Sequence, residues 1–223
     1  MIGGKKIETQ KVPIVFDQQM SARLLGFLSQ AVSGGSIYMN QSFLVNKLGT
    51  QIANKNINII DDPLIPGRTG SRPFDSEGVV GKKLNIIENG VLKNYLLDTY
   101  SANKLKMKTT GHASGTSNYF LTAGKHKPED IIKSVKKGML LVKTIGFGFN
   151  QTTGDLSTGA YGIWIENGKL TYPVSEITIS GNLGKMLIEI GTKFILDEGN
   201  NGQHAPNPVD YGRNGCQQVQ YWF

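Results

Sequence analysis

The dipeptide Asn-Gly occurs twice between runs of β-branched and aromatic residues, in "NIIENGVLKNYLL" and in "GIWIENGKLTYPV". Asn-Gly is favoured at the centre of a type I′ turn, because both central positions of that turn need a positive φ. Asn89-Gly90 and Asn167-Gly168 therefore predict two β-hairpins. The chain has 28 glycines in 223 residues, which indicates many further turns between short strands.

Other segments predict strands and helices around these hairpins. The segments over 11–16 ("KVPIVF") and 56–62 ("NINIIDD") are typical of strands. Apolar residues at helical spacing predict one helix over 17–33 and a second over 128–142, which starts with a proline. We therefore expect an α+β fold: a curved, mostly antiparallel β-sheet or barrel-like domain with a few packed helices.

The charge and the single cysteine limit the classes of function. The net charge of +7 is compatible with nucleic acid or an acidic partner, but the lysines are scattered among aliphatic residues, which favours a solvated surface. Cys216 is alone, so no intrachain disulfide is possible. No stretch approaches the roughly 18 apolar residues of a membrane span, and the first residues are too polar for a signal peptide. We expect a cytoplasmic protein that binds neither membranes nor specific nucleic acid.

The histidines do not form a recognisable metal motif. His112, His126 and His204 lack a His-Glu-x-x-His arrangement, and no phosphate-binding loop or Gly-x-Ser-x-Gly segment is present. His112 lies in "TTGHASGTSNYF", where small neighbours allow close approach of another backbone. It is a candidate for ligand contact, with a structural role as the alternative. Cys216 is interpreted as inert.

The segment "PGRTGSRPFDSEGV" over 66–79 is poor in apolar residues and rich in charge. Asp75 and Glu77 are two residues apart, so on an extended strand they point to the same side. They suit a metal, an acid–base pair or the amides of a peptide. Alternatively they pair with Arg68 and Arg72 and lock the loop, and the sequence leaves both interpretations open.

Three segments occur in a specific order: "DDPLIPGRTGSRPFDSEGV", "YSANKLKMKTTGHASG" and "TGDLSTGAYGIWIENGKLTYPVSEITISGNL". Together they resemble the C-terminal half of the PmbA/TldD family, peptidase family U62, also called modulators of DNA gyrase. The resemblance covers about residues 5–187. It implies that 1–190 form the family's C-terminal domain and that the family's N-terminal domain is absent. Residues 191–223 are a divergent tail, whose order the sequence leaves open.

The resemblance also implies a function. Family members form a cytoplasmic two-subunit metalloprotease that degrades or trims unfolded peptides, in which the TldD subunit carries zinc and the PmbA subunit, or TldE, does not. "PFDSEGV" and "VSEITISGNL" match the PmbA/TldE branch better. We therefore expect no metal or cofactor in this chain and zinc in a TldD-type partner, with a homodimer as the other possible assembly. The alternatives are a self-sufficient metallopeptidase that uses His112 and Cys216, or a DNA- or gyrase-associated protein.

On this resemblance we expect no catalytic residue in the chain, but a wall of the substrate cleft. Its glycine-rich segments suit a peptide that binds by strand addition, because missing side chains allow close backbone approach. Gly115 and Gly159 are expected to lie beside Asp75, Glu77 and His112. The expected cleft residues are Arg68, Arg72, Asp75, Glu77, His112, Gly115, Asp155 and Gly159.

Overall fold

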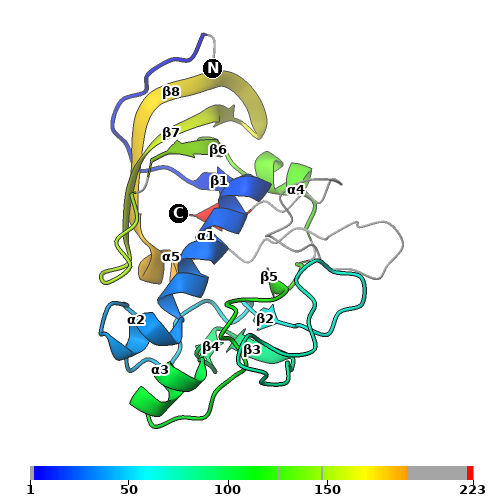
Figure 1. Cartoon of the computed structure of the whole chain (residues 1–223). Helices are drawn as coiled ribbons and strands as arrows, with labels where there is room; N and C mark the ends of the chain where they lie inside the picture. Colours follow the sequence, from blue (N-terminus) through cyan, green and yellow to red (C-terminus); the bar gives the residue numbers. More distant parts are fainter. Residues whose placement is uncertain (1–2, 125, 147, 190–219, 223) are drawn as a thin grey trace.

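The computed structural model describes residues 3–124, 126–146, 148–189 and 220–222, and contains two β-sheets joined by helices (Figure 1). The large sheet has the strand order β8-β7-β6-β1-β9 and the small sheet the order β4-β3-β2-β5. Neighbouring strands run antiparallel except β1 and β6, which are parallel. The α+β prediction is confirmed, with two open sheets rather than a closed barrel among the described residues.

The bounds of the elements are as follows. The large sheet comprises β1 (Ile14–Phe16), β6 (Lys137–Ile145), β7 (Asp155–Glu166), β8 (Lys169–Asn182) and β9 (Gln220–Trp222). The small sheet comprises β2 (Ile59–Asp61), β3 (Leu84–Glu88), β4 (Val91–Leu92) and β5 (Tyr119–Leu121). The helices are α1 (Gln18–Ala31), α2 (Gly34–Tyr38), α3 (Thr99–Lys104), α4 (Pro128–Lys133) and α5 (Leu183–Glu189).

Both Asn-Gly turns are confirmed as hairpin turns. Asn89 and Gly90 have φ values of 49° and 77°, and Asn167 and Gly168 have 49° and 74°. These positive values at both central positions are what a type I′ turn requires. The turns connect β3 to β4 and β7 to β8, respectively.

Helix α1 confirms the first helix prediction, and its start follows from local chemistry. The Asp17 carboxylate accepts the backbone N–H of Met20 at 2.9 Å, which caps the N-terminus. Leu24 and Leu28 lie on the buried side of α1. In Figure 1 this helix runs from the large sheet towards the small one, and a single hydrophobic core includes residues of both sheets.

The second helix prediction, over 128–142, is wrong beyond its first turns. Helix α4 ends at Lys133, and the chain then enters β6. Met139 pairs with Ile14 of β1, and a Cβ on Gly138 would lie only 2.6 Å from the carbonyl oxygen of Pro13. Close strand pairing therefore overrides the helical spacing of the apolar residues, which the strand buries just as well.

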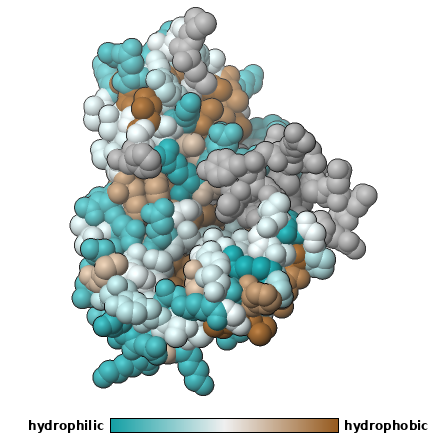
Figure 2. Space-filling view, in the orientation of Figure 1, coloured by the Kyte–Doolittle hydropathy of each residue, from teal (hydrophilic) through white to brown (hydrophobic). Residues whose placement is uncertain are grey.

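The hydropathy of the surface and the length of the helices bear on the expectation that the protein does not bind membranes. The face in Figure 2 is mostly hydrophilic, with separate apolar patches. Among the described residues, each helix is too short or too polar to cross a membrane. The predicted tail over 191–223 lies outside the described residues except for β9.

Candidate functional site

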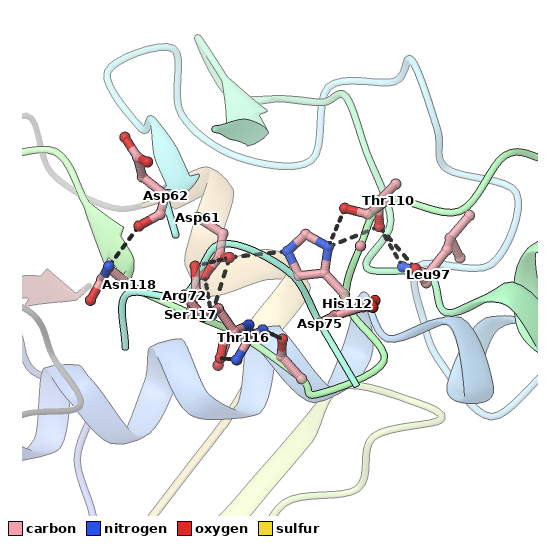
Figure 3. A network of polar contacts seen from close by, with 12 residues as sticks. Asp61, Asp62, Arg72, Asp75, Leu97, Thr110, His112, Thr116, Ser117 and Asn118 are labelled. Carbon is pink, nitrogen blue, oxygen red and sulfur yellow. Dashed lines mark hydrogen bonds and ion pairs between the residues drawn. The ribbon is translucent and has the colours of Figure 1, made fainter. Parts of the chain in front are cut away.

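Two loops that leave neighbouring strands of the small sheet contain most of the predicted site. Residues 62–81 follow β2, and residues 110–118 precede β5. Asp61 and Tyr119 are directly opposite in the antiparallel β2–β5 pair, so the two loops leave the same end of that pair. We call residues 62–81 and 110–118 the paired loops; Figure 3 shows the polar contacts between them.

Asp61 is the buried centre of these contacts. Its side chain is fully buried, and its carboxylate accepts both the backbone N–H of Ser117, at 2.9 Å, and the Ser117 hydroxyl. The His112 Nε2 atom lies 3.0 Å from Asp61 Oδ2 (Figure 3). The other ring nitrogen, Nδ1, lies 2.9 Å from both the carbonyl oxygen and the hydroxyl of Thr110. Both nitrogens of His112 are therefore engaged within the protein.

Asp75 holds the paired loops together at a second point. Its Oδ1 accepts the backbone N–H groups of Glu77 and Val79, and its Oδ2 accepts that of Ala113, each at 3.0 Å. Burial favours a higher pKa for this carboxyl group. The backbone N–H groups of Ala113, Val79 and Glu77, together with the charge of Arg72, outweigh burial and lower the pKa of Asp75 below its ordinary value.

The arginine and the second carboxylate also bind backbone groups. The Arg72 guanidinium donates to the carbonyl oxygens of Gly115 and Thr116. Glu77 accepts the backbone N–H of Thr99 at 2.9 Å, at the start of α3. Arg72 thus joins the two paired loops, and Glu77 ties its own loop to the start of α3. Of the two interpretations that the sequence left open, the locked loop fits these contacts, although the locking groups are mainly amides and carbonyls.

The paired loops also approach so closely that only glycine fits at one point. A Cβ on Gly70 would lie 2.4 Å from the carbonyl oxygen of Ser117. Next to it, the Asn118 amide donates to the Asp62 carbonyl oxygen at 2.6 Å and to the Ser71 hydroxyl at 2.9 Å. These contacts make the paired loops one packed unit.

Most of the predicted site residues come together in the paired loops, and two do not. The residues that the structure brings together there are Arg68, Arg72, Asp75, Glu77, His112 and Gly115.

Asp155 and Gly159 instead belong to β7 of the large sheet. Asp155 accepts the amide of Asn182 at 2.8 Å, and Gly159 lies opposite Ile145 and Thr178 in the neighbouring strands. We expected Gly159 to lie beside Asp75; the structure places Gly159 in β7 of the large sheet and Asp75 in the loop that follows β2 of the small sheet.

Asp61, Thr110 and Ser117 were missed by sequence reasoning about the site. The sequence pattern puts Asp61 in a predicted strand, and its partner Ser117 is 56 residues away along the chain. The signal that was present is a pair of aspartates directly after two isoleucines, since a carboxylate at the end of a buried strand needs a partner.

The donor atoms of the described residues do not fit a zinc ion. No group of three or more His, Cys, Asp and Glu side chains within the described part of the chain is placed to hold a metal. Both ring nitrogens of His112 and both carboxylate oxygens of Asp75 are already hydrogen-bonded to protein groups. Cys216 lies outside the described residues.

Comparison with solved structures defines the class of protein. The fold matches the crystal structure of a protein from Bacteroides thetaiotaomicron described as a candidate modulator of DNA gyrase, with a TM-score of 0.85 and 33% sequence identity. This match covers 99% of the chain and 48% of the other protein. TldE from Thermococcus kodakarensis shares the fold, with a TM-score of 0.80 at 23% identity over 99% of the chain and 50% of that protein.

Sequence comparison then gives the family. The model of the PmbA/TldA metallopeptidase C-terminal domain matches residues 9–195. Metalloprotease PmbA of Escherichia coli O157:H7 is 41% identical over 188 residues, which cover 84% of this chain and 42% of that protein. The chain belongs to the PmbA/TldD metallopeptidase family and is a PmbA-type member. It spans less than half the length of the curated PmbA relatives that it matches.

Proposed function

We propose that this chain acts as the PmbA/TldE-type subunit of a cytoplasmic TldD/TldE metalloprotease complex that degrades or trims unfolded peptides. In this proposal it contributes a wall of the substrate cleft and a surface for the partner, and the TldD-type subunit carries the zinc. The observation that carries the proposal is that the side chains that could ligate zinc are already hydrogen-bonded to other groups of the protein. His112, Asp61 and Asp75 all hold the paired loops through hydrogen bonds, so none of them is available without breaking that structure.

Exposed groups on the paired loops support a contact role. Phe74 is 58% exposed and Val80 is 74% exposed, and the two residues form an antiparallel bridge. Asp75 fixes the turn between them through its bonds to Glu77 and Val79. Exposed apolar side chains on a fixed loop favour contact with another protein or a peptide, because little conformational entropy is lost on binding.

Gly115 adds an accessible stretch of backbone. It has a φ of 75°, and nothing lies within 4 Å of the position that a Cβ would occupy. The Arg72 guanidinium binds its carbonyl oxygen, which holds this backbone in place. An exposed, fixed backbone segment without a side chain suits close approach of a peptide main chain, the part that all unfolded peptides share.

The test is co-expression of this chain with a TldD-type subunit, followed by purification, elemental analysis and a peptide cleavage assay. We expect the two chains to co-purify, zinc to follow the partner, and cleavage to require both. Phe74→Ser with Val80→Ser should weaken co-purification or cleavage, whereas Leu170→Ser, an exposed apolar residue of β8, is the matched control. Stoichiometric zinc in this chain alone, with cleavage that His112→Ala abolishes, would support the self-sufficient metallopeptidase instead.

A further inference from the structure

The hydrogen bonds around His112 determine where its protons are. The Nδ1 atom lies 2.9 Å from the Thr110 carbonyl oxygen, which has only lone pairs to offer. Nδ1 therefore carries a hydrogen. The Thr110 hydroxyl is equally near, but it already accepts the Leu97 N–H at 2.7 Å and has the Leu97 carbonyl oxygen at 3.2 Å for its own proton.

The second ring nitrogen faces a carboxylate that is used as an acceptor. Asp61 accepts the backbone N–H of Ser117 with both oxygens, at 2.9 and 3.2 Å, and the Ser117 hydroxyl with Oδ2. An ionised carboxylate is acceptor-only, and this set of donors suits that form. The remaining contact of Oδ2 is His112 Nε2 at 3.0 Å, so Nε2 also donates a hydrogen.

We propose that His112 is held as a doubly protonated imidazolium, ion-paired with buried Asp61, and that it is a positioning residue for the paired loops. An imidazolium has no free lone pair, so in this state it can neither accept a proton from a substrate nor ligate a metal. The exposed fractions of the two side chains are 3% and 0%, and removal of either partner would leave a buried charge uncompensated. What the loops do for a substrate rests on the proposed function, whereas the charge state does not.

The direct test is nitrogen–proton NMR of the full chain with labelled histidine at neutral pH. We expect His112 to show two N–H cross-peaks and the nitrogen shifts of an imidazolium. A single N–H, with the second nitrogen unprotonated, would overturn the proposal. His126→Gln and His204→Gln assign the His112 signals by elimination, so the test holds even if His112→Gln fails to fold.

A second measurement tests the positioning role through the Ser117 amide, which donates to Asp61. In His112→Gln the protection of this amide against hydrogen exchange should fall by about 100-fold or more, because a buried ion pair has lost one partner. His126→Gln is the matched control and should leave it unchanged. Unchanged protection in His112→Gln would contradict the positioning role.

The activity of the complex then separates this inference from the proposed function. With the TldD-type partner, His112→Gln should raise the KM for peptide while the zinc content of the partner stays the same. If the wild-type pair cleaves no peptide, the proposed function fails and the NMR result still decides the charge state. Loss of zinc from the pair on His112→Gln would contradict a positioning role.

Discussion

The Asp75 carboxylate accepts the backbone N–H of Ala113 at 3.0 Å, across 38 residues of sequence. The same carboxylate also accepts two amides of its own turn, those of Glu77 and Val79. One side chain thus fixes the shape of one loop and attaches it to the other. This double role makes Asp75 the most informative position for testing the paired loops.

Asp75→Asn should destabilise the fold by about 1–3 kcal/mol, because the amide group replaces an acceptor by a donor that faces backbone N–H groups. Urea unfolding of the variant and the wild type measures this difference. Asp62→Asn is the control, since its Oδ1 accepts one local N–H, that of Leu64, and asparagine retains this acceptor. A loss in Asp62→Asn equal to that in Asp75→Asn would show that the bonds of Asp75 carry no special weight.

The lowered pKa of Asp75 predicts a dependence of stability on pH. Because its pKa in the folded state lies below the ordinary value of 3.8, the unfolded state binds more protons between the two values, and stability rises with pH there. The contribution is complete well above 3.8 and is lost as the pH falls through the lowered pKa. We expect the stability difference between wild type and Asp75→Asn to shrink on acidification, in urea unfolding from neutral pH to about pH 3. A stability difference between the two proteins that stays constant over this pH range would contradict the predicted pH dependence.

Two glycines of β7 should differ in how much a substitution by alanine destabilises the fold. A Cβ on Gly162 would lie 2.3 Å from the Leu140 carbonyl oxygen, whereas a Cβ on Gly159 would make ordinary contacts of 3.4 Å or more with Ile145. Gly162→Ala should therefore cost about 1–3 kcal/mol, and Gly159→Ala should leave the thermal midpoint nearly unchanged. Equal midpoints for the two variants would show that the strand shifts to make room.

Gly159 also serves to test whether β7 contributes to the proposed cleft. Since the fold accommodates a side chain at this position, Gly159→Val should fold and, with a TldD-type partner, should abolish peptide processing if the cleft extends to β7. A wild-type rate of processing would remove Gly159 from the proposed cleft, and would leave the role of the paired loops untouched.

The basic charge of the chain should give only weak retention of DNA. Twenty-four lysines and arginines against 17 acidic residues attract phosphate, but binding of this kind falls steeply with salt. In gel-shift assays we expect retention at low salt that disappears by about 200 mM salt. Tight binding that survives that concentration, or that depends on base sequence, would favour the DNA-associated alternative.

Local chemistry made part of this fold predictable. Asn89-Gly90 and Asn167-Gly168 determine their turns by themselves, and Asp17 caps α1 within one turn of helix. The segment over 128–142 was not predictable in this way, because its apolar spacing suits a helix equally well. Its conversion to β6 depends on β1, more than a hundred residues earlier, and on the approach of Pro13 to Gly138.

The candidate site shows the same limit. For the loop over 66–79 the sequence left open whether its charged side chains lock the loop or serve a ligand, and the structure shows Arg72 and Asp75 bonded to backbone groups. The sequence did not indicate Asp61, which lies at the end of a buried strand and meets Ser117 and His112 only after β2 and β5 pair. Contacts between residues distant in sequence decide which polar residues matter, and a single sequence carries little information about them.

The position of β1 in the large sheet has a consequence for folding. This short strand lies near the start of the chain, yet it is inserted between β6 and β9, and Val15 in its middle is fully buried. The hairpin of β7 and β8, with β6 beside it, needs only nearby chain, whereas β1 must close a loop of more than a hundred residues to reach Met139. We expect the β6–β8 meander to form early and the docking of β1 to set the folding rate. During synthesis on the ribosome, β1 and the start of α1 would therefore remain without these partners until β6 emerges, and their apolar residues would stay exposed to association with other chains in that interval.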